Sequence, residues 1–559
     1  MSWVLPSLAA LLLIVVTCYI QSPVWAENDD FTFASILSEG LPEGAFTVFV
    51  NICLSVPIAA LYSIASTVPW WALFQLAIIG VCNVALCQAV LKKLKEKPAL
   101  KWSSLALIQA VCVGCMVQNL QFTLTSGLAC GTGIFFMCGV RSSRFERIFG
   151  TILVLLGALL RPEMILVLTG MLGCVTLVKV ATQWFKNCRD KETRKHVALL
   201  GAINSNELRL FVLHALVVIG ALVVLTAVHA GVYSVAGLND YLAFNDARSA
   251  YMDYPHAQYG DYPQVFSELG WDKDLAILTN NFYCMDDAIT TQSLTKIASL
   301  PVPKNFDLPG AVNCFTIVVV MSIAFMVSFF HARNGAQRFS VVATGFVYYA
   351  LSAALVVTGR FPSRVVIGVS LIFFGMAMSF VESKDTCEKP KNKSRGGLSA
   401  ILCWALVISL VANSAVYLLQ TWSPKTIADK TKSAQISLDA YADAASHPND
   451  VFIEDISLIT TRLYALNVTD YEAKNLVFWG GWEYGSPHLE QKLSSLGLSQ
   501  DRSCALLHEN CYLYTVSPTN ESPLSNLLAR MCTLSGSKVE ATQVRSYPSG
   551  LTVYKLHTS

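Results

Sequence analysis

The chain carries little charge for its length. Asp, Glu, Lys and Arg make up 14% of its 559 residues, against about 25% in typical soluble proteins. Hydrophobic residues make up 54%, and the mean hydropathy is +0.49. This composition excludes an ordinary soluble globular protein and predicts an integral membrane protein.

Other features that would mark particular classes are missing from the sequence. No basic stripe is interleaved with aromatic residues, so nucleic acid is not an expected partner. No repeat of fixed period is present, which argues against a repeat-built transporter. Of the 17 cysteines, most fall in apolar segments, where a thiol behaves as a small hydrophobe. Cys504 and Cys511 form the candidate disulfide.

Long apolar segments are abundant, and basic clusters separate several of them. The predicted spans are 3–23, 70–91, 103–118, 122–140, 148–160, 164–184, 208–232, 310–331, 339–358, 364–381 and 398–420. Basic clusters occur at 92–95, 141–147, 186–195 and 384–395, and the positive-inside rule predicts that they face the cytoplasm. Segment 46–66 is also apolar. Counting it as a span would move 92–95 outside, so we expect it to lie on the outer face.

This assignment predicts a polytopic α-helical membrane protein of about eleven spans, with residues 3–23 as an uncleaved first span. The N-terminus is expected inside and the C-terminus outside. Residues 1–420 form the transmembrane domain, with exterior loops at 24–69 and 233–309. Residues 421–559 change composition and contain strand-like stretches at 475–478, 511–516 and 551–554. We expect a small exterior α/β or α+β domain there.

Two adjacent acids, Asp29 and Asp30, follow the first apolar segment directly. Carboxylates at a membrane surface are costly unless they pair, coordinate or take protons. One of them could act as a general base, and the pair could supply oxygen ligands to Mg²⁺ or Mn²⁺. The plainer interpretation is a helix N-cap for residues 31–39.

Several arginines are predicted on the same side of the membrane as these acids. Arg161 and Glu163 lie in a turn between two spans, Arg360 and Arg364 link two later spans, and Arg248 lies in loop 233–309. Guanidinium groups bind phosphate through paired donors. A base together with such arginines is what sugar transfer from a lipid phosphate requires. Taken singly, Arg161 and Arg364 could be head-group anchors and Glu163 only a local partner of Arg161.

At these residues the chain resembles the GT-C superfamily of polytopic glycosyltransferases. The acidic motif of that family follows the first span, as Asn28-Asp29-Asp30-Phe31 does here, and precedes a juxtamembrane helix, here 46–66. A closer resemblance is to bacterial membrane proteins that share NDDF-x-x-x-SILSEG, R-P-E, D-Y-P and G-G-W-x-x-G-S-P. The sequence departs from the family at the entry to the juxtamembrane helix, where Gly44-Ala45-Phe46 replaces the His-Pro-Pro-like motif of many relatives.

The resemblance implies an inverting membrane glycosyltransferase in a bacterial cytoplasmic membrane. It would take a polyprenyl-phosphate-linked sugar at the outer face and transfer it to a cell-envelope glycan or lipid. One aspartate would be the base or help bind a metal, and Arg161, Arg360 or Arg364 would face the lipid phosphate. Trp482 and Tyr484 are candidates for stacking on acceptor sugars, although an aromatic residue after two glycines is also typical of a packed turn.

Three alternatives remain open from the sequence. An envelope glycan polymerase or ligase would depend on Arg248 and loop 233–309 more than on the acids. A transporter or flippase of envelope precursors would favour polar groups at mid-membrane, and the charges here cluster at the ends of spans. A structural membrane protein whose tail binds a partner is the third.

Overall fold

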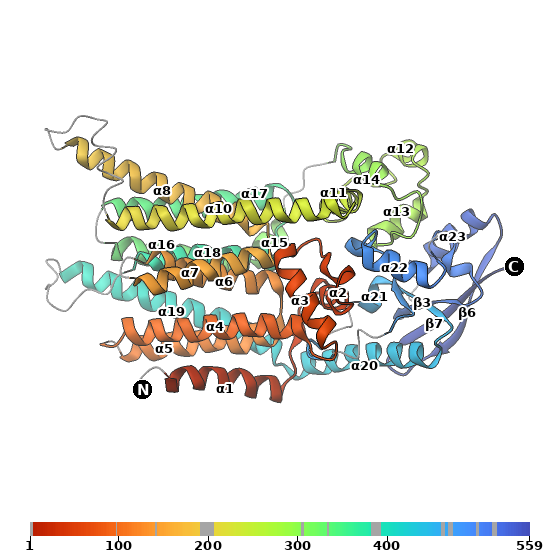
Figure 1. Cartoon of the computed structure of the whole chain (residues 1–559), viewed down its shortest axis with the longest axis horizontal. Helices are drawn as coiled ribbons and strands as arrows, with labels where there is room; N and C mark the ends of the chain where they lie inside the picture. Colours follow the sequence, from red (N-terminus) through yellow and green to blue (C-terminus); the bar gives the residue numbers. More distant parts are fainter. Residues whose placement is uncertain are drawn as a thin grey trace.

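The computed structural model places a bundle of long helices beside a region that contains the C-terminal sheet (Figure 1). It describes residues 4–559 except 97, 140–141, 190–205, 303–306, 333–334, 382–392, 460–463, 468–472, 499–501 and 517–522. Parts of the basic clusters 141–147, 186–195 and 384–395 lie outside the described residues. We call the end of the bundle next to the C-terminal sheet the sheet-facing end.

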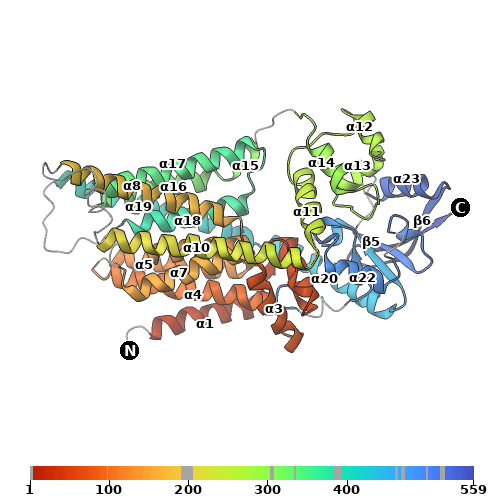
Figure 2. The same cartoon turned by 45° about the horizontal axis from the view of Figure 1, so that its top comes forward.

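The bundle consists of apolar helices that run nearly along the long axis of the molecule (Figures 1 and 2). They are α1 (Val4–Ile20), α4 (Trp70–Lys93), α5 (Pro98–Gln109), α6 (Phe122–Cys138), α7 (Arg144–Leu160), α8 (Met164–Arg189), α10 (Asn206–Val235), α16 (Phe315–His331), α17 (Gly335–Val357), α18 (Ser363–Ser379) and α19 (Lys393–Thr421). A π-helix, η2 (Ala110–Val117), continues α5.

Among the described residues, five helical stretches are long and apolar enough to cross a membrane. They are Trp70–Lys93, Pro98–Val117, Met164–Ala181, Arg209–Val235 and Gly335–Val357. Shorter apolar helices accompany them, including Phe122–Cys138 and Ser363–Ser379. The chain therefore has the helices of an integral membrane protein, while the count of eleven spans and the orientation stay predictions. Helix α3 (Ile52–Ile64) has 13 residues, fewer than the roughly 20 needed to cross.

Helices α6 and α18 approach each other closely because glycines line their contact. A Cβ atom on Gly127 would lie 2.6 Å from the Cα of Gly368, and one on Gly131 or Gly375 would collide with the facing backbone. Small residues of this kind allow close helix packing within membranes. The contact fixes the first turn of α18 relative to the first turn of α6, and both turns contribute to the site described below.

Short elements cover the sheet-facing end of the bundle. Strand β1 (Val24–Trp25) pairs in parallel with β2 (Asn119–Leu120). Helix α2 (Asn28–Ser38), η1 (Glu43–Ala45) and α3 follow β1. Helices α11 (Asn239–Met252), α12 (Pro263–Glu268), α13 (Lys273–Asn280) and α14 (Thr291–Ala298) come from the predicted loop 233–309, and α15 (Leu308–Asn313) begins at the end of that loop.

A five-stranded mixed sheet occupies the C-terminal region, in the order β4-β3-β5-β7-β6. Its strands are β3 (Val451–Glu454), β4 (Leu476–Phe478), β5 (Cys511–Val516), β6 (Val539–Ser546) and β7 (Leu551–Thr558). Strand β3 is parallel to β4 and β5, whereas β7 is antiparallel to β5 and β6. The other elements are α20 (Pro424–Ser446), α21 (Ile456–Ile459), η4 (Gly481–Glu483), α22 (Pro487–Ser495), η5 (Ala505–Leu507) and α23 (Pro523–Ser535). All three stretches predicted as strand-like coincide with strands.

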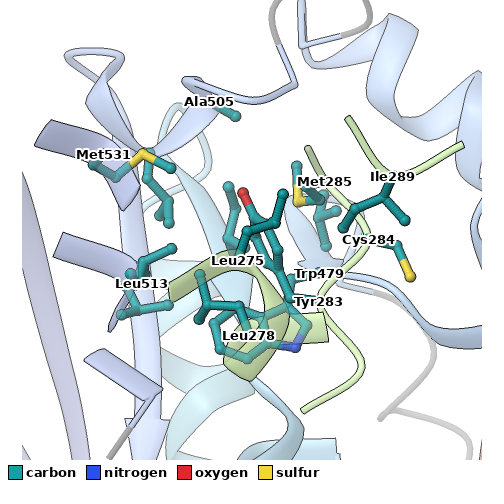
Figure 3. Packing of buried hydrophobic residues seen from close by; sticks show 14 of the residues in the cluster. Leu275, Leu278, Tyr283, Cys284, Met285, Ile289, Trp479, Ala505, Leu513 and Met531 are labelled. Atoms are coloured by element: carbon teal, nitrogen blue, oxygen red, sulfur yellow. The ribbon is translucent and has the colours of Figure 1, made fainter. Parts of the chain in front are cut away.

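The 233–309 segment and the C-terminal region share one hydrophobic core. Figure 3 shows Leu275, Leu278 and Tyr283 close to Leu513 and Met531 of the C-terminal region, and all are buried in one cluster. The segment is therefore a packed part of a larger unit. Cys504 and Cys511 are both free thiols, so the candidate disulfide is wrong; Cys511 is buried in the same core, where it acts as a small apolar residue.

Candidate functional site

The two adjacent aspartates lie in the first turn of α2 and have different surroundings. Glu27 occupies the N-cap position, but its side chain makes no capping bond. Successive residues of a helix project about 100° apart, so Asp29 and Asp30 face different neighbours. Their negative charges are favourable at this helix end.

Asp30 is completely buried and bound to two other elements. Gln75 Nε2 of α4 donates to its Oδ1 at 2.8 Å, and the backbone N–H of Phe122, at the start of α6, donates to Oδ1 and Oδ2 at 3.1 and 3.3 Å. Thr125 in turn donates to Gln75. Burial raises the pKa of Asp30 well above its ordinary value, against the opposing effect of the Gln75 hydrogen bond. These contacts join α2 to α4 and α6.

Asp29 instead faces a cationic residue of α18. Arg364 Nη2 lies 3.5 Å from Asp29 Oδ2, while Nη1 of the same guanidinium lies 2.6 Å from Glu27 Oε2. On its other oxygen, Asp29 accepts a hydrogen bond of 3.2 Å from Trp482 Nε1. The Asp29 side chain keeps 15% of its surface exposed and that of Arg364 keeps 24%. Residues 29, 364 and 482 thus meet at a partly accessible point on the sheet-facing end.

Arg161 is linked to this point by aromatic rings. Its guanidinium lies 5.0 Å from the ring centroid of Phe122 and 5.5 Å from that of Phe49, distances at which a cation and a ring attract. The ring of Phe49 lies 5.6 Å from that of Trp482. Glu163 forms an ion pair with Arg161 at 3.0 Å and is itself 54% exposed. The structure therefore places Arg161 next to the Asp29 cluster, with Glu163 at its outer edge.

Arg248 and Arg360 form a second cluster centred on a different acid. Arg360 Nη1 lies 3.3 Å and Arg248 Nη2 3.9 Å from Asp253 Oδ2. Arg248 is almost fully buried and also donates twice to Asn245 Oδ1. The carboxylate of Asp253 accepts a further bond of 2.7 Å from Ser249. The five residues predicted to bind the substrate phosphate are thus divided between two clusters. Arg161, Glu163 and Arg364 lie in or beside the Asp29 cluster, and Arg248 and Arg360 lie at Asp253.

Trp482 and Tyr484, predicted together, have different positions. Trp482 belongs to η4 and packs against Phe33 of α2 at 4.8 Å, with its N–H on Asp29. Tyr484 packs against Phe244 and Arg502, and burial raises the pKa of its hydroxyl. The preceding glycines make the turn possible: Gly481 has φ of +76°, and a Cβ on Gly480 would lie 2.6 Å from the Cys284 nitrogen.

Sequence reasoning missed three residues of the site. Glu27 and Asp29 both form ion pairs with Arg364. The position of Glu27 two residues before the acidic pair could have indicated this role from the sequence. Gln75 was detectable as an uncharged polar residue within a predicted span. Tyr241, whose hydroxyl donates to the Trp482 carbonyl at 3.1 Å, gave no signal, because the contact joins positions 241 residues apart.

The arrangement does not fit a metal bound jointly by Asp29 and Asp30. Both oxygens of Asp30 accept hydrogen bonds within a closed environment, whereas Asp29 faces Arg364. Among the described residues, no three His, Cys, Asp or Glu side chains are grouped as metal ligands. We therefore derive no step through a metal.

Comparison with solved structures finds a structural likeness over nearly the whole chain. No protein family matches the sequence, and no curated protein does. The chain is similar to the crystal structure of ArnT from Cupriavidus metallidurans bound to undecaprenyl phosphate, with a TM-score of 0.40 and 12% identity over 99% of this chain and 98% of that chain.

Proposed function

We propose that the protein is a membrane glycosyltransferase. It transfers a sugar from a polyprenyl-phosphate-linked donor to an envelope glycan or lipid acceptor at the outer face of a bacterial cytoplasmic membrane. The observation that carries the proposal is the meeting of Asp29, Arg364 and Trp482 at the end of an apolar helix bundle. This point lies where a lipid-borne phosphate and a polar acceptor could meet.

In the proposed reaction Asp29 is the general base. The acceptor hydroxyl oxygen attacks the anomeric carbon and its proton passes to the Asp29 carboxylate. The bond between the anomeric carbon and the phosphate oxygen breaks, and the electron pair leaves with the polyprenyl phosphate. Attack opposite the leaving group inverts the anomeric configuration. A positioned base of this kind contributes about 10²- to 10⁴-fold in rate.

Arg364 and Arg161 would bind the donor phosphate. The guanidinium of Arg364 is held by two acids, so phosphate binding would exchange one of those partners for a phosphate oxygen. Arg161 lies against aromatic rings with one acidic partner, Glu163, which leaves further N–H donors for an anion. Both charges would stabilise the departing phosphate as negative charge develops on it.

The test is binding and release of undecaprenyl phosphate by the purified protein in nanodiscs. We expect Arg364→Gln and Arg161→Gln to weaken its binding at least tenfold, the scale of one charge-assisted hydrogen bond. Arg338→Gln is the matched control, because Arg338 lies near the start of α17, at the end of the bundle away from the sheet. If all three variants bound undecaprenyl phosphate as tightly as the wild type, Arg161 and Arg364 would not be the residues that bind the donor phosphate. Turnover is followed as undecaprenyl phosphate released from a panel of undecaprenyl-phosphate-linked sugars in the presence of envelope glycan and lipid acceptors, which we call the transfer assay.

The second arginine cluster supports an alternative. An envelope glycan polymerase or ligase would use Arg248 and Arg360, which converge on Asp253. In that case Arg248→Gln would abolish product formation while Asp29→Asn left it intact. The opposite ranking supports sugar transfer at Asp29.

A further inference from the structure

A groove opens on the side of the bundle formed by α1, η2 and α19. Thr17, Gly114, Leu418, Leu419, Trp422 and Ser423 line it together with Pro424, and it holds about 530 Å³. The lining is mainly apolar. Thr17, Gly114, Leu418 and Leu419 belong to helices of the bundle, and Trp422 follows the last residue of α19. Figure 1 shows α20 running from the end of the bundle toward the sheet.

The floor of the groove depends on the π-helix. Trp422 Nε1 donates to the Gly114 carbonyl at 3.3 Å, and a Cβ on Gly114 would lie 2.5 Å from Cδ2 of Leu418. A π-helical turn inserts an extra residue into a helix and is frequent at functional sites. Here it presents a glycine backbone to α19.

A lysine, Lys430, lies beyond the end of the groove that Ser423 and Pro424 line. Lys430 is seven residues after Ser423, the N-cap residue of α20. The two residues therefore lie on the same side of that helix, about 10 Å apart along its axis. The half-buried ammonium of Lys430 lies 3.2 Å from Asn119 Oδ1. Among the described residues no carboxylate pairs with it, and burial lowers its pKa. A partly buried cation held by a neutral amide alone is incompletely compensated.

We propose that this groove is a binding site for an anionic bilayer phospholipid, with one acyl chain along Leu418, Leu419 and Trp422 and the phosphate on Lys430. Charge complementarity selects an anionic head group. In this proposal the phospholipid phosphate lies at Lys430, which contacts Asn119 of β2, whereas the donor phosphate lies at Arg364, which contacts Glu27 and Asp29. The site goes beyond the proposed transfer reaction and does not depend on it.

Bound lipid would also support the reaction site mechanically. Asn119 pairs with Val24 in the β1–β2 bridge, and Phe122, three residues later, donates its N–H to Asp30. Lipid at Lys430 would therefore stabilise the segment that positions α2.

The experiment is native mass spectrometry of the full chain with phosphatidylglycerol or phosphatidylcholine as the added lipid. We expect Lys430→Gln to weaken phosphatidylglycerol binding roughly tenfold and to leave phosphatidylcholine binding unchanged. Lys432→Gln, an exposed lysine of the same helix, is the matched control and should bind as wild type does. Thr17→Phe fills the groove and should reduce binding of both lipids, whereas Val16→Phe, on the exposed surface of α1, should not.

Equal loss in the Lys430 and Lys432 variants, or equal affinity of the wild type for the two lipids, would overturn the proposal. So would displacement of bound phosphatidylglycerol by undecaprenyl phosphate in a Lys430-dependent manner, because the groove would then hold the donor.

Discussion

Adjacent residues of identical type have separate tasks in this protein. Asp30 is a buried joint between three helices, and Asp29 is a partly exposed member of an ion-pair cluster. The sequence could place both acids after the first span, but adjacency alone does not say which side chain enters the protein. The division of roles is set by Gln75, Phe122, Arg364 and Trp482, which lie between 45 and 453 positions away.

The pH dependence of stability tests the role of Asp30. Its pKa is raised in the folded protein, so above about pH 4, the ordinary value, the folded state holds a proton that the unfolded state has lost. Stability therefore falls as pH rises toward the folded pKa. Between pH 5 and pH 8 the unfolding temperature of the wild type should therefore fall relative to that of Asp30→Asn. Thermal unfolding of both proteins in detergent measures this, and a difference that grows in favour of the wild type contradicts it.

The indole N–H of Trp482 orients the proposed base. Trp482→Phe keeps an aromatic ring against Phe33 and Phe49 but removes the bond to Asp29. We expect about a tenfold loss of rate in the transfer assay, since one hydrogen bond to a charged group contributes roughly 1.5 kcal/mol or more. The unfolding temperature should change little. A large drop in that temperature with an unchanged rate per folded molecule would assign Trp482 to packing alone.

At the scale of elements, the contact between α6 and α18 sets the position of Arg364. Gly127→Leu places a side chain where the Gly368 backbone lies. Because backbone must move, we expect a loss of about 1–3 kcal/mol in stability together with lower transfer. Gly220→Leu in α10 is the control, since nothing lies within 4 Å of that Cβ position. Equal unfolding temperatures for the two variants would show that the close packing is dispensable.

The sequence could predict many elements but few of their contacts. Apolar length locates the helices, as at 70–91 and 339–358, and short runs rich in aromatic and β-branched residues locate strands such as β5. Hydropathy cannot show that residues 233–309 and the C-terminal region share one core, because that core depends on pairs such as Leu275 and Leu513. Arg248 and Arg360 were predicted to serve with Arg161 and Arg364, yet Asp253 holds the first two in a separate cluster.

At the scale of the whole molecule, a buried ion pair joins the 233–309 segment to the C-terminal region. Arg530 of α23 contacts Asp286 Oδ2 at 2.7 Å and Asp272 Oδ2 at 2.9 Å. Arg530→Met leaves two acids without their cation, so we expect about 3–5 kcal/mol of destabilisation and faster proteolysis within 239–300. Lys538→Gln, an exposed residue of the same region, should behave as the wild type. Equal protease resistance in both variants would contradict the linking role.

The whole-molecule account depends on Asp29 as the base at the sheet-facing end of the bundle. The most direct measurement is the transfer assay on Asp29→Asn at equal amounts of folded protein in membranes. We predict a rate at least 100-fold below that of the wild type, with undecaprenyl phosphate still bound through Arg364 and Arg161. A wild-type rate in Asp29→Asn would contradict the account.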